Sequence, residues 1–250
     1  MTLPTGITLL ELDTVDSTNT YAKDHFDALA DGTLVCADMQ TAGRGRLGRP
    51  WISPRGTNIY ATFVMKQIPD PFYATAAVSL AALKLLRESH PEGDFFIKWP
   101  NDLYSGYRKI AGLLSETVAG PGGIRGVIAG IGININPEPA ELELIDRPAA
   151  SLRSLSGRTF EVKKLKARLL EHLAEYYRLY LTDPDALSAE WRACNRIVGR
   201  EVTLTDAAGR EHRVRVRAIA PDGSLDAEEN GSEYRFNCGD VTLRREDWQN

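Results

Sequence analysis

Two long helical patterns divide a chain of 250 residues whose other apolar segments read as short strands. The first pattern covers residues 72–88 and follows Asp70-Pro71, an N-cap residue and a proline that favour a helix start. The second covers residues 162–181, and its apolar side chains fall on one stripe: Val162, Leu165, Leu169, Leu173, Tyr176 and Tyr180. A third helix is predicted from Asp183-Pro184 to about Asn195. We therefore expect an α+β fold.

Strands are predicted between and before these helices. They cover residues 9–12, 33–37, 58–66, 95–99, 110–118 and 124–133. Glycines and Pro121 separate the last two strands, as in a hairpin. A short helix is predicted over residues 21–29, after the run Asp16-Ser17-Thr18-Asn19, which is rich in N-cap residues.

The pattern changes after about residue 195. Five short strands are predicted at residues 201–205, 212–220, 224–227, 233–236 and 240–243. Turn signals such as Pro221-Asp222-Gly223 and Asn230-Gly231 separate them. Evenly spaced short strands predict a small barrel or sandwich. We expect two domains, residues 1–195 and residues 196–250.

Composition narrows the class of protein. With 43% hydrophobic and 26% charged residues, the chain is neither disordered nor collagen-like. A net charge of −4 disfavours a protein that coats nucleic acid, and no apolar run is long enough for a membrane span. The start shows no signal peptide, and Cys36, Cys194 and Cys238 are far apart, so we expect reduced thiols in the cytoplasm. The four histidines lack metal-ligand spacing, which makes a zinc site an unfavoured interpretation.

A glycine- and arginine-rich segment, GRGRLGRPW at residues 43–51, lies within a long polar stretch, residues 39–57. It satisfies G-x-G-x-x-G formally, but Pro50 prevents the helix that a dinucleotide fingerprint needs, so we reject that interpretation. Glycines let the backbone approach a ligand, and arginines bind carboxylates and phosphates. The segment is either an anion-binding loop that closes over a ligand or a flexible basic arm.

Three further motifs each have two interpretations. KWPNDL at residues 98–103 ends a strand and could present Asn101 and Asp102 to a ligand or form an ordinary turn. RKIAGLL at residues 108–114 contains Lys109, either a surface lysine or a cation at the mouth of a pocket. GIGIN at residues 130–134 has strand glycines that indicate either a close ligand or tight packing.

Together, in this order and spacing, the four motifs resemble the catalytic domain of the biotin–protein ligases. Ser17-Thr18-Asn19 matches the family's STN motif, and Gln40 matches the glutamine before its glycine-arginine loop. The resemblance covers about residues 10–195. The last strands, ending in CGDVTLR at residues 238–244, resemble the family's SH3-like domain less closely. The family resemblance implies a mixed or antiparallel sheet with helices, as in class II synthetases, and a C-terminal SH3-like β-barrel.

The resemblance implies a ligase with two reaction steps. Biotin and ATP give biotinyl-5′-AMP and pyrophosphate, with Mg²⁺ on the nucleotide, and biotin is then transferred to a lysine of a biotin carboxyl carrier protein. The biotin-binding residues implied are Ser17, Thr18, Asn19, Gln40, Gly43, Arg44, Arg46, Lys109 and Gly130. The nucleotide-binding residues implied are Arg46, Arg49, Trp51, Asn101, Lys109 and Asn134.

The catalytic residues implied are Lys109, Arg46 and Asp102. Asp102 either holds a magnesium-bound water or orients the incoming lysine amine, and the chain provides no metal cage of its own. Trp51 and Tyr60 are expected to wall the pocket. Either a monomer or a homodimer fits the family.

The sequence departs from the family at two points. Only 16 residues precede Ser17, too few for the winged helix that many relatives use to bind DNA, so we expect a monofunctional ligase without a DNA partner. Leu47 stands where relatives often have another arginine.

Two other functions compete with this interpretation. A lipoate–protein ligase shares the fold, but KWPND and the glycine-arginine loop favour biotin. A nucleic-acid-binding module is the other alternative, because Arg213, Arg215 and Arg217 alternate with valines on one predicted strand.

Overall fold

The computed structural model describes residues 6–143, 145, 148–237 and 239–242. Its larger sheet has seven strands in the order β1-β2-β3-β7-β6-β5-β4. In chain order these are β1 Thr8–Val15, β2 Thr33–Gln40, β3 Ile59–Met65, β4 Phe95–Lys98, β5 Asp102–Ser105, β6 Arg108–Gly120 and β7 Gly123–Ile133. β1 and β2 are parallel and the other neighbours antiparallel, so the expected mixed sheet is confirmed.

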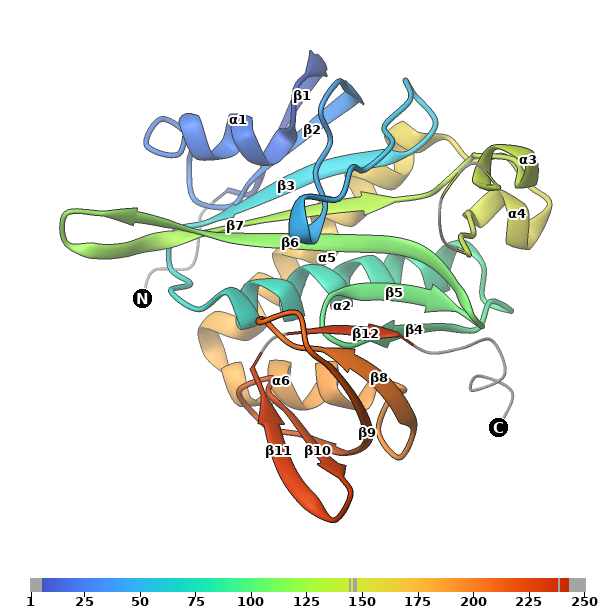
Figure 1. Ribbon diagram of the computed structural model, residues 1–250. Helices are drawn as coiled ribbons and strands as arrows, with labels where there is room; N and C mark the ends of the chain where they lie inside the picture. The colour runs from blue at the N-terminus through green and yellow to red at the C-terminus, as the bar shows by residue number, and fades with distance from the viewer. Residues whose placement is uncertain (1–5, 144, 146–147, 238, 243–250) are drawn as a thin grey trace.

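Two helices, α2 Pro71–Ser89 and α5 Val162–Thr182, cover one face of this sheet (Figure 1). A third helix, α6 Pro184–Ala193, packs against both of them beside the C-terminal strands. The Asp70 side chain accepts a hydrogen bond from the Phe72 amide and caps α2. The predicted stripe of α5 faces inward at Leu169, Leu173 and Tyr176, and all three side chains are buried. The two long helical patterns are confirmed to within a residue or two at each end.

The opposite face carries α1, Thr18–Asp24. Alternation along the strands separates the two faces, because successive side chains of a strand point in opposite directions. Phe63 and Ala129 pack with the large helices, whereas Val64 and Ile128 pack against Ala22 of α1. Beyond α1, on the same face, β7 presents Gly130 and Gly132, which leave room above the sheet.

The C-terminal strands form a second sheet in the order β11-β10-β9-β8-β12. Their bounds are β8 Glu201–Thr205, β9 Glu211–Ile219, β10 Leu225–Glu229, β11 Ser232–Phe236 and β12 Asp240–Thr242. All five predicted strands are present, and Asn230 and Gly231 make the predicted turn with positive φ values of 51° and 79°. Among the described residues, β11 and β12 are not paired, so this antiparallel sheet is not the closed barrel we expected. Cys238, Leu243 and Arg244 of the C-terminal motif lie outside the described residues.

The second sheet packs on the first through α2 and the turn after β4. The Trp99 indole donates to the Gly223 carbonyl at 2.8 Å, and the buried Lys98 ammonium donates to the Val241 carbonyl. A Cβ on Gly223 would lie 2.2 Å from the Phe72 ring. Lys98 and Trp99, the first two residues of KWPNDL, therefore join the two sheets, a role that the sequence analysis did not predict.

Several short elements were also missed. β5 was interpreted only as part of a motif, and it completes a hairpin with β4. The helices α3 Pro139–Leu142 and α4 Leu152–Ser156 have five residues or fewer and show no clear periodicity. A single 3₁₀ turn, Arg46–Gly48, interrupts the glycine-arginine loop where we expected no helix.

Candidate active site

A cavity of about 460 Å³ lies beside α1, above β6 and β7. It brings together residues from every predicted motif. Thirteen of the predicted site residues line it: Ser17, Thr18, Asn19, Gln40, Arg44, Arg46, Arg49, Trp51, Asn101, Asp102, Lys109, Gly130 and Asn134. The exception is Gly43, which lies behind the wall. A Cβ there would lie 2.4 Å from the Trp51 carbonyl oxygen, so the position requires glycine for packing.

Glycines make the floor of the cavity flat. Gly112 of β6 and Gly132 of β7 are paired neighbours in the sheet, and the Trp51 indole lies over them. A Cβ on Gly132 would lie 2.3 Å from that indole ring, and one on Gly130 would lie 2.0 Å from Asn19 Oδ1. The strand glycines therefore admit a Trp and an Asn side chain to the cavity floor. The buried Trp51 Nε1 has no hydrogen-bond partner among the described residues.

Lys109 and Asp102 form an ion pair at one end. Lys109 Nζ lies 2.5 Å from Asp102 Oδ1 and 5.5 Å from the centre of the Trp51 ring. Both side chains are mostly buried, at 21% and 10% exposure, so their charges are poorly screened by water. The Lys109 backbone also binds the segment at residues 148–150, through the Pro148 carbonyl and the Ala150 amide. That segment forms a wall of the cavity that the sequence analysis missed.

The glycine-arginine loop crosses over β6 and β7 (Figure 1), and Arg44, Arg46 and Arg49 of the loop line the cavity. Arg44 and Pro50 form an isolated antiparallel bridge at its base, and the Gly45 amide donates to the Arg49 carbonyl at 2.7 Å. At its tip, Leu47 has a φ of 56° and a side chain that is 72% exposed. A leucine in the left-handed region is strained, and such strain is typical of ligand-binding segments.

The three cavity-lining arginines of the loop have different partners. Arg44 pairs with Glu116 at 3.2 Å and Arg49 with Asp240 at 2.6 Å. Arg46 donates instead to the neutral Asn101 Oδ1 at 3.0 Å. Within the described part of the site, Arg46 is thus the cation whose positive charge faces a neutral partner, which leaves it available to an anion.

At the other end, uncharged polar groups gather. The Thr18 amide donates to Gln40 Oε1 at 2.9 Å, and Gln40 Nε2 donates to the Ser53 hydroxyl at 2.9 Å. Ser17 lies at the N-cap position of α1 and is only 4% exposed. This end offers hydrogen-bond donors and acceptors, whereas the Lys109 end offers charge.

Other predicted residues have supporting positions. Asn134 lines the cavity but donates its amide to the Ala150 carbonyl at 3.1 Å, which fixes the wall at residues 148–150. Tyr60 does not wall the cavity, contrary to our expectation. It is fully buried, its hydroxyl donates to the Pro54 carbonyl at 2.9 Å, and burial raises its pKa to about 12.

Two acidic residues of the site were missed by the sequence analysis. Asp240 comes from β12 of the second sheet, and although it lies within CGDVTLR, the sequence analysis assigned it no role in the site. Glu116 lies two residues beyond RKIAGLL on the strand face that Gly112 and Leu114 share, so alternation along β6 could have identified it.

The basic face of β9 is neutralised by nearby carboxylates. Arg215 pairs with Glu201 at 3.0 Å, Arg213 lies 3.7 Å from the same carboxylate, and Arg217 pairs with Glu228. Paired arginines release few counterions on binding a phosphate backbone, so this face does not favour a nucleic-acid-binding module.

The described residues contain no group of three or more His, Cys, Asp or Glu side chains that could hold a metal ion. Every described helix is too short or too polar to cross a membrane.

The chain is similar in sequence to a known family and to named ligases. The Biotin/lipoate A/B protein ligase family matches residues 11–134. The bifunctional ligase/repressor BirA of Salmonella typhimurium is 30% identical over 93% of this chain and 73% of its own length. The biotin–[acetyl-CoA-carboxylase] ligase of Mycobacterium tuberculosis is 30% identical over 86% of this chain and 80% of its own.

A solved structure extends the similarity to the second sheet. The biotin protein ligase from Aquifex aeolicus, in complex with biotin and ATP, superposes with a TM-score of 0.81 and 26% identity. The match covers 95% of this chain and 99% of that one. The family match, the two relatives and this superposition show that the chain belongs to the biotin/lipoate A/B protein ligase family.

Proposed function

We propose that the chain activates biotin with ATP to form biotinyl-5′-AMP and transfers biotin to a lysine of a biotin carboxyl carrier protein. The observation that carries the proposal is the division of the cavity. Uncharged hydrogen-bonding groups line one end, and Arg46 and Lys109 line the other. Biotin has the same division, with a neutral ureido ring at one end and a carboxylate at the other. The relatives named as biotin ligases support it further.

The ureido end is served by α1 and β2. Ser17, Thr18 and Gln40 offer both donors and acceptors, which a neutral urea needs in place of charges. Asn19 and Gly130 shape the floor beneath the ring, and Arg44 completes this end of the site, with Gly43 packed behind it. The flat glycine floor suits the fused rings and the apolar chain of biotin.

The first step takes place at the charged end. An oxygen of the biotin carboxylate attacks the α-phosphorus of ATP, the bond to the β-phosphate oxygen breaks, and pyrophosphate leaves with the electron pair. Two anions must approach each other, and charge builds on the phosphate. Arg46 and Lys109 stabilise that charge, because preorganised cations in a site shielded from water lower such barriers by several kcal/mol or about 10²–10³-fold in rate per donor.

The nucleotide lies along the loop and the wall opposite. Arg49 is placed toward the polyphosphate, while Trp51, Asn101 and Asn134 surround the nucleotide side. Mg²⁺ fits this site as an ion that arrives with ATP. The described cavity offers the carboxylates Asp102 and Asp240, and each is already paired with a cation. These carboxylates would therefore contact the water ligands of Mg²⁺, and the chain itself does not surround the ion with direct ligands. When bound, Mg²⁺ neutralises part of the triphosphate charge.

The second step transfers biotin to the acceptor lysine. Its amine nitrogen attacks the acyl carbon of biotinyl-AMP, an amide forms, and the bond to the AMP oxygen breaks. Asp102 is placed beside Lys109 at this end, and we assign it the role of orienting the incoming ammonium or a magnesium-bound water. Transfer is accelerated by proximity, because holding the lysine amine next to the acyl carbon of biotinyl-AMP replaces a bimolecular encounter with a reaction inside one complex.

We also propose that residues 196–250 form a second domain that completes the nucleotide side. Asp240 of β12 lines the cavity and binds Arg49, which supports this division of labour. The buried thiol of Cys36, whose pKa burial raises to about 12, and the unpaired Cys194 agree with a reducing cytoplasm. A monomer or a homodimer, without a DNA partner, fits the proposal.

Isotopic exchange between pyrophosphate and ATP distinguishes biotin from lipoate. We expect exchange that depends on biotin and stays near background with lipoate. Exchange of equal rate with both acids, or with lipoate alone, contradicts the assignment of substrate. The loop variant Arg46→Ala serves as the control for background exchange.

A further inference from the structure

Glu116 is an acidic residue beside the cavity that none of the roles above uses. It lies on β6, opposite Ile128 of β7, and its side chain is 22% exposed. It points to the same sheet face as Leu114, which lines the cavity, but Glu116 itself does not line it. Any effect of Glu116 on a ligand must therefore pass through other side chains.

One oxygen of Glu116 serves two cavity residues from different segments. Glu116 Oε2 accepts from Asn19 Nδ2 at 2.8 Å and from the Arg44 guanidinium at 3.2 Å. Asn19 belongs to α1 and is 4% exposed, while Arg44 belongs to the loop and is 45% exposed in its side chain. The carboxylate thus ties the start of α1 and the start of the loop to one point on the rigid sheet.

The contact with Glu116 also decides the orientation of the Asn19 amide. An ionised carboxylate only accepts hydrogen bonds, so the nitrogen of Asn19 must face it, as it also faces the Leu114 carbonyl at 3.0 Å. The oxygen of Asn19 then faces the Thr62 hydroxyl at 2.7 Å. Because Asn19 Oδ1 can only accept, Thr62 is the donor in this hydrogen bond.

The order of protons continues to the ligand end of the cavity. Thr62 Oγ1 is also the donor toward Thr18 Oγ1, at 2.8 Å, so the one Thr62 proton is shared between Asn19 and Thr18. Thr18 Oγ1 in turn donates to Gln40 Oε1 at 3.2 Å, which also accepts from the Thr18 amide at 2.9 Å. With its proton directed at Gln40, Thr18, which lines the cavity, offers its oxygen as an acceptor to a donor of the ligand.

We infer that Glu116 is a positioning residue for the ureido end of the proposed biotin site. It acts through Asn19 and Thr62 to set the hydroxyl of Thr18 as an acceptor, and through Arg44 to hold the loop over the ring. Both effects lie away from Arg46 and Lys109, so Glu116 affects the binding of biotin more than that of ATP. The inference rests on the proposed function, since it names the ligand of this end as a cyclic urea.

An ordinary surface ion pair would behave differently. Exposed Arg–carboxylate pairs contribute little, and their loss affects no ligand selectively. The Glu116 carboxylate is instead shared with a buried amide, and a buried amide that loses a charged partner must either find another or turn over. Turning the Asn19 amide would place its nitrogen, a donor, against the Thr62 hydroxyl, which would then have to direct its proton to Thr18 alone.

The test compares Glu116→Ala with Glu116→Gln in the full chain. The alanine variant removes both contacts, whereas glutamine keeps an oxygen that can accept from Asn19 but loses the charge on Arg44. We expect the alanine variant to raise KM for biotin about tenfold, equal to about 1.4 kcal/mol, with KM for ATP and kcat changed less than about threefold. Glutamine should restore most of this loss, leaving KM for biotin raised about threefold.

Asp27→Asn is the matched control. It removes the exposed ion pair that Asp27 makes with Arg125 of β7, and it does not touch the Asn19 network. The control should leave both KM values within about twofold of those of the parent chain. Thermal unfolding of each variant shows whether it is folded.

Three results would overturn the inference. They are a KM for biotin within about twofold of the parent in Glu116→Ala, an equal rise in KM for ATP, or no recovery with glutamine. If the alanine variant does not fold, glutamine decides alone: a selective rise of about threefold in KM for biotin supports the inference, and an unchanged KM contradicts it. Failure of the parent chain to bind biotin in calorimetry would instead refute the proposed function.

Discussion

Lys109 is the residue whose surroundings fit a role in the first reaction step most closely. Its ammonium lies between the Asp102 carboxylate and the Trp51 ring, and its backbone is bound to the wall at residues 148–150. A cation held on two sides before the ligand arrives needs little reorganisation when charge develops nearby. Arg46 complements it from the loop, with a neutral partner that an anion can displace.

We expect Lys109→Ala to slow adenylate formation by about 10²–10³-fold, because one charged donor is lost from a closed site. The fold should persist, since Lys109 binds its neighbours through the backbone and through Asp102, which remains beside solvent-accessible cavity space. Single-turnover formation of biotinyl-AMP measures the effect, with circular dichroism as the check on folding. A folded variant that forms the adenylate at the parent rate would remove Lys109 from the catalytic residues.

Most residues of the site could be predicted because its motifs are local in sequence and each carries a distinctive residue type. Lys98 and Tyr60 show where this reasoning ends. Lys98 begins KWPNDL, but the sequence analysis gave it no role, and its partner, the Val241 carbonyl, lies 143 residues away. Tyr60 alternates onto the cavity face of β3, but its hydroxyl donates to the Pro54 carbonyl and the residue does not line the cavity. Partners so distant in sequence are set by packing, which no short pattern encodes.

At the scale of elements, the glycine-arginine loop is the segment expected to respond to ligands. Three polar side chains tie it down: Glu116, Asn101 and Asp240. These contacts are exposed or partly exposed, and the loop tip is strained at Leu47. Segments with few buried apolar contacts open locally at low free energy.

We expect biotin with ATP to protect the loop from trypsin. Cleavage after Arg44 and Arg46 should slow at least about fivefold when the adenylate fills the cavity, because the ligand binds the open state poorly. Arg210 is the internal control, since it lies in a turn of the second sheet and its side chain is 76% exposed. Equal protection at both places, or none in the loop, would contradict closure that depends on the ligand.

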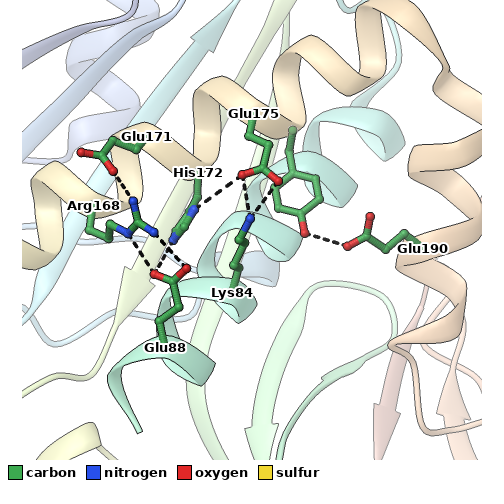
Figure 2. Close-up of polar contacts among 8 residues, drawn as sticks. Lys84, Glu88, Arg168, Glu171, His172, Glu175 and Glu190 are labelled. Atoms are coloured by element: carbon green, nitrogen blue, oxygen red, sulfur yellow. Dashed lines mark hydrogen bonds and ion pairs between the residues drawn. The ribbon is translucent and has the colours of Figure 1, made fainter. Parts of the chain in front are cut away.

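The pair of helices α2 and α5 is joined by a polar network on the side away from the cavity (Figure 2). Glu88 receives two bonds from the Arg168 guanidinium, at 2.9 Å and 3.0 Å, and a third from the buried His172 at 2.9 Å. Nearby, Lys84 of α2 binds Glu175 of α5. Hydrogen bonds from Arg168, and then from His172, lower the pKa of Glu88 to about 2.

This network predicts how stability changes in acid. A carboxylate with a lowered pKa contributes stability above its unfolded pKa of about 4.5, and that contribution disappears as the pH falls toward 2. The Glu88 side chain is 37% exposed, so we expect only about 1 kcal/mol at neutral pH. Glu88→Gln should therefore unfold more easily than the parent at pH 7 and equally at pH 2–3.

Urea unfolding at several pH values measures the difference. Glu228→Gln, which removes an exposed pair with Arg217 in the second sheet, is the control for the loss of one surface charge. A Glu88→Gln penalty that stays constant down to pH 2 would show that Glu88 stabilises the helices by packing and not through its charge.

The helices and strands themselves could be predicted where an element is long or alternates clearly. Phe63 and Val64 divide cleanly between the two faces of the sheet, and Leu169 and Leu173 of α5 point to the core as its period requires. β5 and the short helices α3 and α4 were missed, since four or five residues give no measurable period. The order of the strands, in which β7 lies between β3 and β6, was not predicted either, because it depends on the packing of distant segments.

At the scale of the whole molecule, the second sheet shares its core with the first. Val202, Leu204 and Val214 belong to the same apolar cluster as the residues of α2. The Trp99 indole and the Lys98 ammonium donate to carbonyls of the second sheet, and a chain without that sheet would lose both hydrogen bonds and expose the apolar cluster that the two sheets share.

A chain that ends at Asn195 should therefore be less stable, with a Tm at least about 10 °C lower or with aggregation on purification. Calorimetry of both chains measures this. A shortened chain with an unchanged Tm would show that residues 196–250 are independent of the first sheet. If it stays folded, the rates of adenylation and of transfer on that chain test whether Asp240 is needed on the nucleotide side.

If the cavity joins biotin to AMP as we propose, the product biotinyl-5′-AMP can be detected directly. The purified chain is mixed with biotin and ATP labelled at the α-phosphate, and the protein-bound products are separated. We expect labelled biotinyl-5′-AMP in an amount close to that of the enzyme, and none with Lys109→Ala on the same time scale. Labelled ATP that remains unchanged with biotin, at an enzyme concentration that gives saturating binding, would contradict the proposal that this chain forms biotinyl-5′-AMP.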